Sequence, residues 1–217
     1  MNEPAWPPAS AVVLAGGLSR RLNQDKRRLK LWGAAGPTLL EHSIALVGAL
    51  CTDVVVVLND PELFPGLPAR IVGDAYPDGG ALAGIYSGLA AAREPYALVV
   101  ACDMPLLNPR LLTAMLARPR DYDVLVPRAP IPGATRNRLS VEPLHAIYGT
   151  NCLAPLRTAL EAGHNRITDC YAALRVAYVE PEELRRYDPA GHALLNLNTP
   201  VELETALRII QGEANAS

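Results

Sequence analysis

Short apolar runs alternate with longer stretches of helical period along most of this chain. The runs consist mainly of valine, leucine, isoleucine and alanine, without the strict polar alternation of a half-exposed strand. Such runs are typical of strands that are buried on both faces of a sheet. They lie at 12–14, 54–58, 70–72, 96–101, 124–126, 144–148 and 176–179. Because helical patterns separate most of them, the order predicts βα units around a mostly parallel sheet.

Capping residues mark where several of these helices begin. Thr38 and Glu41 have the spacing of a capping box, and Asn108 followed by Pro109 gives a second helix start. Thr199, which stands before a proline and three residues before a glutamate, opens the last helix in the same way. Two further helices are expected at 82–93 and 151–162. The pattern predicts a single α/β domain over the whole chain.

The clearest candidate site follows the first strand. Gly16 and Gly17 lack the Cβ atoms that would keep backbone N–H groups away from an anion, and Ser19 adds a hydroxyl donor. Arg21 and Lys26 then add positive charge. A tight turn with solvated arginines is the alternative, but the whole combination favours a polyphosphate ligand. Neither a G-x-x-x-x-G-K-[ST] motif nor a G-x-G-x-x-G motif follows the strand, which argues against a P-loop or an ordinary dinucleotide fold.

Two other strands end in a carboxylate. Asp103 follows the run at 96–101 and is placed to anchor Mg²⁺ on a bound polyphosphate, although it could also cap the turn before Pro105. Asp74 follows the run at 70–72, and a glycine-rich stretch containing Gly80 then enters a helix. That stretch either approaches a flat ring whose amines Asp74 accepts, or serves only as a turn for close helix packing.

Three other features bear on a second ligand. Asn196 and Asn198 stand on alternate residues of an extended segment, so both could face one ligand. His145 could line the site, but a buried histidine with satisfied hydrogen bonds is the favoured interpretation. The segment 128–143 has no clear period and is interpreted equally as a disordered loop or as a lid. Its arginines would suit an anionic substrate.

Composition narrows the class of protein. The chain of 217 residues has a formal net charge of −2, so no global positive field favours nucleic acid or an anionic membrane as a partner. The four cysteines form no C-x-x-C pair and stand in apolar contexts. They predict reduced buried thiols and a cytoplasmic protein rather than a disulfide framework or a zinc site. The N-terminal segment does not have the pattern of a secretory signal.

Five motifs in order along the chain resemble those of one family, the molybdenum cofactor guanylyltransferases, within the wider nucleotidyltransferase superfamily. The segment 14–26, L-A-G-G-L-S-R-R-L-N-Q-D-K, is similar to the family's L-A-G-G-x-S-x-R-M-G-x-D-K. The others are G-A-L-A-G-I at 80–85, C-D-M-P at 102–105, P-L-H-A-I-Y at 143–148 and N-L-N-T-P-V-E-L at 196–203. The resemblance therefore covers nearly the whole chain.

The resemblance implies a three-layer α/β/α nucleotidyltransferase fold, Rossmann-like, with a mostly parallel sheet. It also implies a Mg²⁺-dependent transfer of GMP from GTP to the phosphate of molybdopterin in its molybdenum-loaded form, with release of pyrophosphate. Transient contact with molybdoenzymes or other cofactor-biosynthesis proteins would follow. A cytidylyltransferase for the same cofactor, a sugar-phosphate nucleotidyltransferase and a non-catalytic nucleotide-binding adaptor are the alternatives.

The motifs also imply roles for individual residues. Lys26, Arg21 and Asp103 would be catalytic, with Asp103 as the metal ligand, and Asn196 and Asn198 would face the pterin substrate or the metal. The residues expected to bind nucleotide are Leu14, Ala15, Gly16, Gly17, Lys26, Asp74, Gly80 and Asp103.

Two departures from the family pattern matter. Asn23 replaces a glycine, and asparagine is the non-glycine residue that best tolerates positive φ. Ala81 replaces a proline, so the loop expected to read the base is less fixed.

Overall fold

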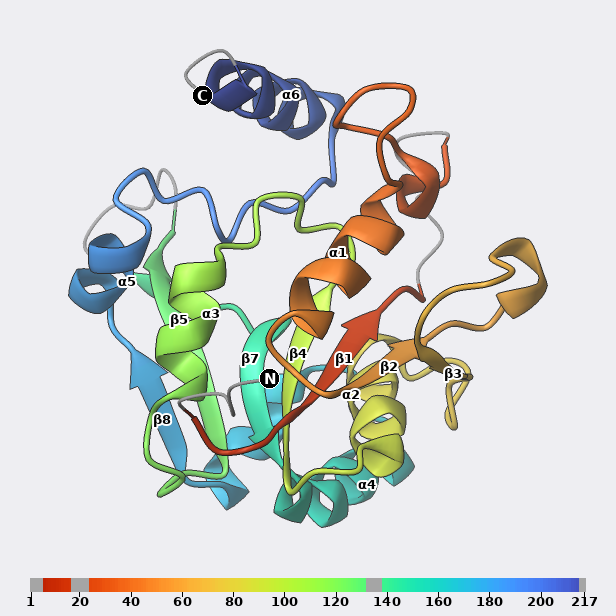
Figure 1. Ribbon diagram of the computed structural model, residues 1–217. Coiled ribbons are helices and arrows are strands. Elements are labelled where there is room, and N and C mark those ends of the chain that lie inside the picture. The colour runs from red at the N-terminus through yellow and green to blue at the C-terminus, as the bar shows by residue number, and fades with distance from the viewer. Residues whose placement is uncertain (1–5, 17–23, 132–137, 215–217) are drawn as a thin grey trace.

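The computed structural model describes residues 6–16, 24–131 and 138–214, in which an eight-stranded sheet lies between two layers of helices (Figure 1). The strand order is β3-β2-β1-β4-β7-β5-β6, and β8 pairs with β5 beside this path. The strands are β1 (Ser10–Leu14), β2 (Asp53–Val57), β3 (Arg70–Val72), β4 (Tyr96–Ala101), β5 (Val124–Pro130), β6 (Leu139–Val141), β7 (His145–Gly149) and β8 (Val176–Val179).

Most of the strands run in one direction. Strand β1 pairs in parallel with both β2 and β4, β2 pairs in parallel with β3, and β5 pairs in parallel with β8. Strand β7 runs antiparallel between β4 and β5, and β6 is antiparallel to β5. The predicted α/β fold with a mostly parallel sheet is therefore confirmed.

Alternate residues of each central strand enter two separate cores. Ala11 and Val13 of β1 face one core with α1 and α3, which lie together on the near face in Figure 1. Val12 and Leu14 face the other core with α2 and α4. The α-helices are α1 (Leu39–Gly48), α2 (Gly80–Ala91), α3 (Pro109–Leu116), α4 (Leu153–Glu161), α5 (Pro181–Tyr187) and α6 (Pro200–Ala214), with short 3₁₀ helices η1 (Lys26–Arg28), η2 (Pro61–Leu63), η3 (Thr150–Cys152) and η4 (Ile167–Ala173).

The predicted helix starts are confirmed by hydrogen bonds. The Thr38 hydroxyl accepts from the Glu41 N–H, and the Glu41 carboxylate accepts from the Thr38 N–H, which completes the capping box of α1. The Asn108 side chain accepts from two N–H groups at the start of α3. These caps satisfy donors that the helix itself leaves free.

A glycine allows α2 to lie close to the sheet. A Cβ on Gly88 would overlap the Val12 side chain of β1, so any larger residue would push the helix away from the strand. Because α2 begins beside the carboxyl end of β3, this packing fixes the position of its N-terminus relative to the strand ends.

The segment 128–143 is only partly as expected. Strand β5 extends to Pro130, and β6 pairs with it antiparallel, with Arg128 opposite Val141. The two ends of the segment thus form a hairpin rather than an irregular loop, while residues 132–137 lie outside the described chain. The helix α5 was also not predicted, because it is short and five of its seven residues are polar, charged or proline.

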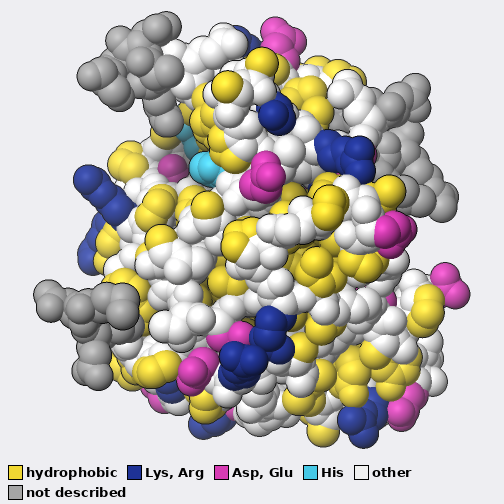
Figure 2. All heavy atoms as spheres, turned by 45° about the vertical axis from the view of Figure 1, so that its right-hand side comes forward, with side chains coloured by type: hydrophobic (Ala, Val, Ile, Leu, Met, Phe, Trp, Pro, Cys, Tyr) yellow, Lys and Arg dark blue, Asp and Glu magenta, His cyan; other side chains and the backbone are white. Residues whose placement is uncertain are grey.

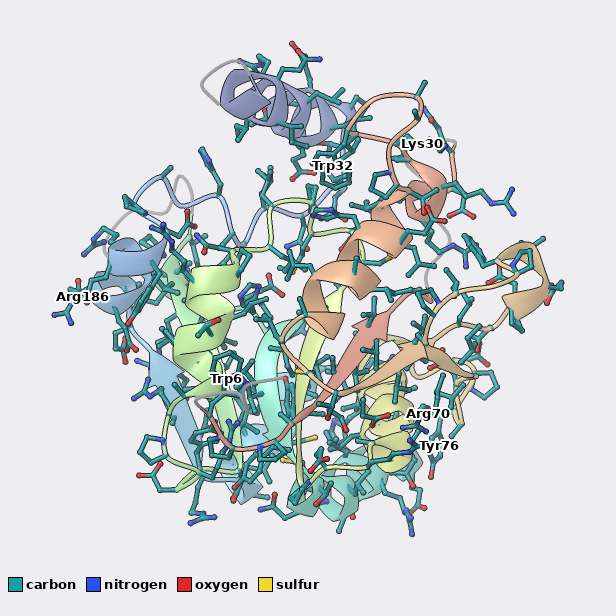
Figure 3. All side chains as sticks on the ribbon, in the orientation of Figure 1. Trp6, Lys30, Trp32, Arg70, Tyr76 and Arg186 are labelled. Carbon is teal, nitrogen blue, oxygen red and sulfur yellow. The ribbon has the colours of Figure 1, made fainter. Side chains whose placement is uncertain are left out.

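Helix α6 packs away from the two main cores. It contributes Ala206 and Ile210 to a third cluster with Leu31 and Leu39, and Trp32 lies beneath it in Figure 3. On the face shown in Figure 2, charged side chains of both signs are scattered among apolar and neutral ones. Within the described residues, no helix combines the length and the apolarity needed to cross a membrane.

The central strands end at a common level. In register, Leu14 of β1 lies opposite Val57 of β2 on one side and Ala101 of β4 on the other. The chain turns from β1 toward β2 and later returns to β4 on the opposite side, so the order reverses at β1. In open α/β sheets, ligands bind outside the carboxyl ends of strands at such a reversal.

Candidate active site

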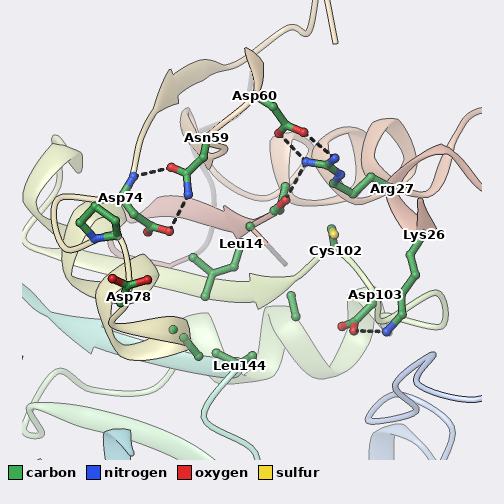
Figure 4. Close-up of a pocket in the computed structure, with 16 residues that line it drawn as sticks. Leu14, Lys26, Arg27, Asn59, Asp60, Asp74, Asp78, Cys102, Asp103 and Leu144 are labelled. Carbon is green, nitrogen blue, oxygen red and sulfur yellow. Dashed lines mark hydrogen bonds and ion pairs between the residues drawn. The ribbon is translucent and has the colours of Figure 1, made fainter. Parts of the chain in front are cut away.

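A cleft of about 700 Å³ lies at this end of the sheet (Figure 4). Its size is within the range of small-molecule and cofactor sites. Its wall combines backbone from the loop after β1 with charged and amide side chains from the loops after β2, β3 and β4. The lining residues are Leu14, Ala15, Gly16, Lys26, Arg27, Asn59, Asp60, Asp74, Pro77, Asp78, Gly80, Ala81, Ala101, Cys102, Asp103 and Leu144.

The start of the first loop is held by the sheet. The Ala15 N–H donates to the Val57 carbonyl at 3.0 Å, and the Leu14 carbonyl accepts from the Cys102 N–H at 3.0 Å. A Cβ on Gly16 would lie in ordinary contact with Asp74, 3.5 Å from a carboxylate oxygen, so the backbone here runs close beside that side chain. Gly17 and Arg21 lie outside the described residues, as does Asn23, and their roles stay predictions.

Lys26 joins three parts of the chain at the edge of the cleft. Its Nζ lies 3.1 Å from Asp103 Oδ2 and donates to Asn198 Oδ1, also at 3.1 Å. Its side chain is 14% exposed and that of Asp103 is 25% exposed. An ammonium has three N–H donors, so the contacts among the described residues leave one for a ligand. The structure therefore brings the predicted catalytic lysine and carboxylate together.

Asp74 forms a pair with a residue that the motifs did not identify. Asn59 donates from Nδ2 to Asp74 Oδ2 at 3.0 Å, and its Oδ1 accepts from the Asp74 N–H at 2.8 Å. The other carboxylate oxygen, Asp74 Oδ1, is buried and has no hydrogen-bond partner among the described residues. A buried oxygen without a partner is costly, so this atom is suited to accept from a ligand.

The N-terminus of α2 forms the opposite wall of the cleft. Gly79 is the N-cap and no side chain caps the helix, so its first N–H groups are not satisfied by a capping side chain. Gly80 has φ of +57°, a conformation that favours glycine. Ala81 adopts the helix without the proline of the family pattern. The predicted glycine-rich entry into a helix thus lies at the cleft, with Gly80 in its lining.

The two asparagines near the last helix take different positions. Asn198 reaches Lys26, whereas Asn196 donates from Nδ2 to the Glu142 carboxylate at 3.2 Å. The backbone between them is tied to the site, because the Leu197 N–H donates to the Asp103 carbonyl at 2.9 Å. Burial raises the pKa of Glu142. Neither asparagine lines the cleft itself, and of the two only Asn198 contacts a lining residue, Lys26.

Several functional candidates had no motif to identify them. Arg27, Asn59 and Asp60 all line the cleft. The signal that could have found Asn59 and Asp60 is their place directly after the buried strand β2, beside β1 in the sheet. Asn59 pairs with Asp74 and Asp60 with Arg27, and no local sequence pattern predicts these two pairs.

Two buried groups at this end of the sheet are not suited to catalysis. Burial raises the pKa of the Cys102 thiol to about 12, so it is protonated near neutral pH. His145 is fully buried and does not line the cleft. The prediction that His145 has satisfied hydrogen bonds is wrong, because neither ring nitrogen has a hydrogen-bond partner among the described residues. The four cysteines are free and buried, as predicted.

The arrangement can position and stabilise a polyanion. The described residues contain no cluster of three or more His, Cys, Asp or Glu side chains that would form a complete metal cage. Asp103 and Asn198 instead present two oxygens to one cation, here the Lys26 ammonium. One or two protein oxygens suit Mg²⁺ when phosphate oxygens and water complete its octahedron.

Comparisons with known proteins agree on one family. The model of the MobA-like NTP transferase domain matches residues 11–177. The chain is 47% identical over 196 residues to a probable molybdenum cofactor guanylyltransferase of Chloroflexus aggregans, covering 90% of this chain and 91% of that protein. It is 32% identical over 198 residues to the molybdenum cofactor guanylyltransferase of Desulfosudis oleivorans, covering 91% and 93%.

Solved structures show the same fold. The molybdopterin-guanine dinucleotide biosynthesis protein A of Archaeoglobus fulgidus superposes with a TM-score of 0.77 at 26% identity, covering 94% of this chain and 99% of that one. The 2-C-methyl-D-erythritol 4-phosphate cytidylyltransferase of Thermus thermophilus has a TM-score of 0.72 at 20% identity, covering 94% and 100%. The second likeness concerns the fold alone.

Proposed function

This chain belongs to the family of MobA-like NTP transferase domains, and we propose that it transfers GMP from GTP to the terminal phosphate of molybdenum-loaded molybdopterin, with release of pyrophosphate. The observation that carries the proposal is the Lys26–Asp103 pair, at 3.1 Å, in a nucleotide-sized cleft beyond β1 and β4. The names of the relatives supply the nucleotide and the acceptor.

The nucleoside lies between the loop after β1 and the start of α2 in this proposal. The unpartnered Asp74 Oδ1 supports this placement, because it needs a donor and the exocyclic amine of guanine is one. Asn59 fixes the carboxylate through its other oxygen. Gly80 allows the backbone to approach the base closely.

The triphosphate lies along the first loop toward Lys26. Backbone N–H groups after Ala15 and the free N–H of Lys26 are donors for its oxygens. Gly17 and Arg21 are proposed to complete this cradle. Lys26 then stabilises the negative charge that accumulates on the departing pyrophosphate.

Asp103 is the proposed Mg²⁺ ligand, with Asn198 Oδ1 as a second oxygen. Both atoms already face a cation in the form of the Lys26 ammonium, which supports their fit to a hard divalent ion. When bound, Mg²⁺ supplies positive charge across the phosphate oxygens. The other carboxylate oxygen, Asp103 Oδ1, does not contact Lys26 and would accept hydrogen bonds from water.

The acceptor approaches from the side of Asn196, Asn198 and Glu142. An oxygen of its phosphate forms a bond to the α-phosphorus of GTP, while the bond from the α-phosphorus to the bridging oxygen breaks and pyrophosphate leaves with the electron pair. A phosphate nucleophile is already anionic near neutral pH, so the protein needs no nucleophile or general base of its own. Its contribution is position and charge.

The free buried cysteines also support a proposed location in the cytoplasm, where thiols stay reduced. No observation favours a second function over this one.

Pyrophosphate release tests the proposal directly. Purified protein, Mg²⁺ and molybdenum-loaded molybdopterin are incubated with GTP, CTP, UTP or ATP, and released pyrophosphate is measured in a coupled assay. We expect turnover with GTP far above the other three, and none without molybdopterin. Selective turnover of CTP would replace the guanine assignment, and binding without pyrophosphate release would favour the adaptor. A thermal shift with each nucleotide reports binding separately from turnover.

A further inference from the structure

The guanidinium of Arg27 is buried in the wall of the cleft, where Figure 4 shows its pair with Asp60. It uses all of its donors within the protein. Nε and Nη2 donate to the two oxygens of Asp25, both at 2.8 Å. Nη1 and Nη2 donate to the two oxygens of Asp60 at 2.6 and 2.7 Å. Nη1 also donates to the Ala15 carbonyl at 3.3 Å. Because a guanidinium has five N–H donors, none remains for a ligand.

These contacts join three segments that form the phosphate side of the cleft. Ala15 follows β1, Asp60 follows β2, and Asp25 is the N-cap of η1, where its side chain also accepts from the Arg27 N–H. Lys26 stands between Asp25 and Arg27 in the sequence. The backbone that carries the catalytic lysine is therefore fixed on both sides by the same guanidinium.

The side chains of Arg27, Asp25 and Asp60 also determine the charge of this wall of the cleft. Hydrogen bonds from Arg27 lower the pKa of Asp25 and of Asp60, so both are carboxylates near neutral pH. Together the three side chains carry a formal charge of −1. Without Arg27 the charge would be −2, beside a ligand that is itself a polyanion, in a partly desolvated wall where repulsion is strong.

We propose that Arg27 is a positioning residue for the triphosphate site: it offsets one of the two negative charges of Asp25 and Asp60 and holds Lys26 toward Asp103, without touching the phosphates. The inference rests on the proposed function, because it requires a nucleoside triphosphate in this cleft. It assigns separate tasks to adjacent cations. Lys26, with a free donor, contacts the ligand, and Arg27, with none, makes the site acceptable to an anion.

The neighbouring Arg28 provides a matched control. Its side chain is 53% exposed, it lies 3.9 Å from Asp25, and its guanidinium carbon is 5.1 Å from the Phe64 ring centroid, compared with 4.6 Å for Arg27. Arg28→Gln therefore removes the same charge from the same short helix without opening the buried cluster.

The experiment measures the Kd for GTP with Mg²⁺, and for inorganic pyrophosphate, by titration calorimetry on the full chain. We expect Arg27→Gln to raise both Kd values about tenfold or more, and Arg28→Gln to change them less than about threefold. The double variant Arg27→Gln/Asp60→Asn restores the charge of −1. It should return to within about threefold of wild type.

The double variant separates this proposal from a purely structural ion pair. If Arg27 only held the loops together, replacing a second member of the cluster by an uncharged amide would leave binding as weak as in Arg27→Gln or weaker. The single variant Asp60→Asn covers the case in which Arg27→Gln does not fold. With Arg27 present it makes the wall less negative, so GTP should bind at least twofold more tightly; weaker binding would overturn the proposal.

Arg27→Lys tests the positioning part. A lysine keeps the charge but cannot form the two bidentate pairs, so the Kd should stay within about threefold while kcat falls about tenfold. An unchanged kcat would contradict the proposal that Arg27 holds Lys26 toward Asp103. If the wild type binds pyrophosphate but turns over no GTP, the proposed function fails while the Arg27 inference is still decided by the pyrophosphate titrations. If the wild type binds neither, both are wrong.

Discussion

The two ends of the sheet hold buried charges in contrasting states. At the amino end, Asp53 at the start of β2 accepts from Ser10, from Arg70 and from the Arg93 N–H. At the carboxyl end, Asp74 has an oxygen without a partner in the part of the chain that the structure describes, and Lys26 has an N–H that is not used by its two partners. One end is satisfied by the protein alone, and the other is left for a ligand.

The pKa values at the amino end reflect this satisfaction. Burial alone would raise the pKa of Asp53, but hydrogen bonds from Ser10 and Arg70 outweigh it and leave the pKa lowered. Asp123 at the start of β5 accepts from Arg175 and Asn151, and the hydrogen bonds from Arg175 lower its pKa to about 2. Both carboxylates join loops at the base of the sheet.

The contrast gives a physical criterion for separating structural from functional charge. A buried carboxylate whose oxygens are all used stabilises the fold and offers nothing to a substrate. A buried carboxylate oxygen without a partner destabilises the ligand-free protein. Such an oxygen is expected in a cleft where a bound ligand supplies the missing hydrogen bond. Arg27 is the exception at the carboxyl end, and its satisfied state is the reason for assigning it a positioning role.

The largest effect is expected on turnover, from substitutions at the carboxyl end of the sheet. Lys26→Ala and Asp103→Ala should each lower kcat by about 100-fold or more, because each removes a charge that stabilises the reacting phosphates. The far-ultraviolet circular dichroism should not change, since both side chains lie at the edge of the cleft. Lys30→Ala is the matched control, because Lys30 is the only other lysine and is exposed. Turnover near that of wild type in either variant would contradict the mechanism.

Acidification should destabilise the fold through His145, which is buried at the carboxyl end of the sheet but does not line the cleft. Burial lowers the pKa of His145 to about 4, from an ordinary value near 6.5. Between these pH values the unfolded chain binds a proton that the folded protein does not, so stability falls as pH falls. The free energy of unfolding should drop by about 2 kcal/mol from pH 7 to pH 5.

Urea unfolding at several pH values measures this effect. Half-buried His42, whose pKa burial also lowers, adds a loss of the same sign, whereas Glu142, whose pKa is raised, opposes it. His145→Leu removes one titrating group, so the free energy of unfolding should change less with pH than in the wild type. The same slope in the variant would show that His145 does not cause it.

Breaking the amino end should affect stability and leave catalysis unchanged. Asp53→Ala removes the acceptor for Ser10, Arg70 and the Arg93 N–H, at a cost of about 1.5–2 kcal/mol after allowing for the exposure of Arg70 to water. Thermal unfolding measures the loss. At a temperature where the variant is folded, its kcat should match wild type, and a loss of kcat comparable to that of Lys26→Ala would contradict the separation of the two ends.

The smallest effect is expected from Asn59→Ala, which frees the Asp74 carboxylate without removing it. The Kd for GTP should rise about tenfold or less, because the oxygen that accepts from the base is no longer fixed. Asp74→Asn is the comparison and should weaken binding more. Equal binding of GTP by Asn59→Ala and wild type would show that Asp74 needs no such support.

Local signals in the sequence predicted most of the fold. Buried strands and capped helices depend on neighbours within a few residues, as in the capping box of Thr38 and Glu41. The hairpin partner β6 was missed because the segment 128–143 contains prolines and no period. The short helix α5 was missed because polar residues dominate it.

The candidate site was predicted in its motifs but not in its pairings. Lys26, Asp103 and Asp74 follow strand ends or stand in the first loop, so the fold class alone places them near one another. The partners of these residues depend on tertiary contacts: Asn198 reaches Lys26 across 172 positions, and Asn59 reaches Asp74 across 15. No local pattern records such distances.

The central claim is that the acceptor phosphate attacks the α-phosphorus of GTP beside Lys26 and Asp103. The most direct measurement follows radiolabel from GTP in parallel reactions with molybdenum-loaded molybdopterin, using α-labelled and γ-labelled nucleotide. We expect the α-label to appear in the dinucleotide form of the cofactor and the γ-label in pyrophosphate. Transfer of the γ-label to molybdopterin, or release of the γ-label as inorganic phosphate without any dinucleotide, would contradict it.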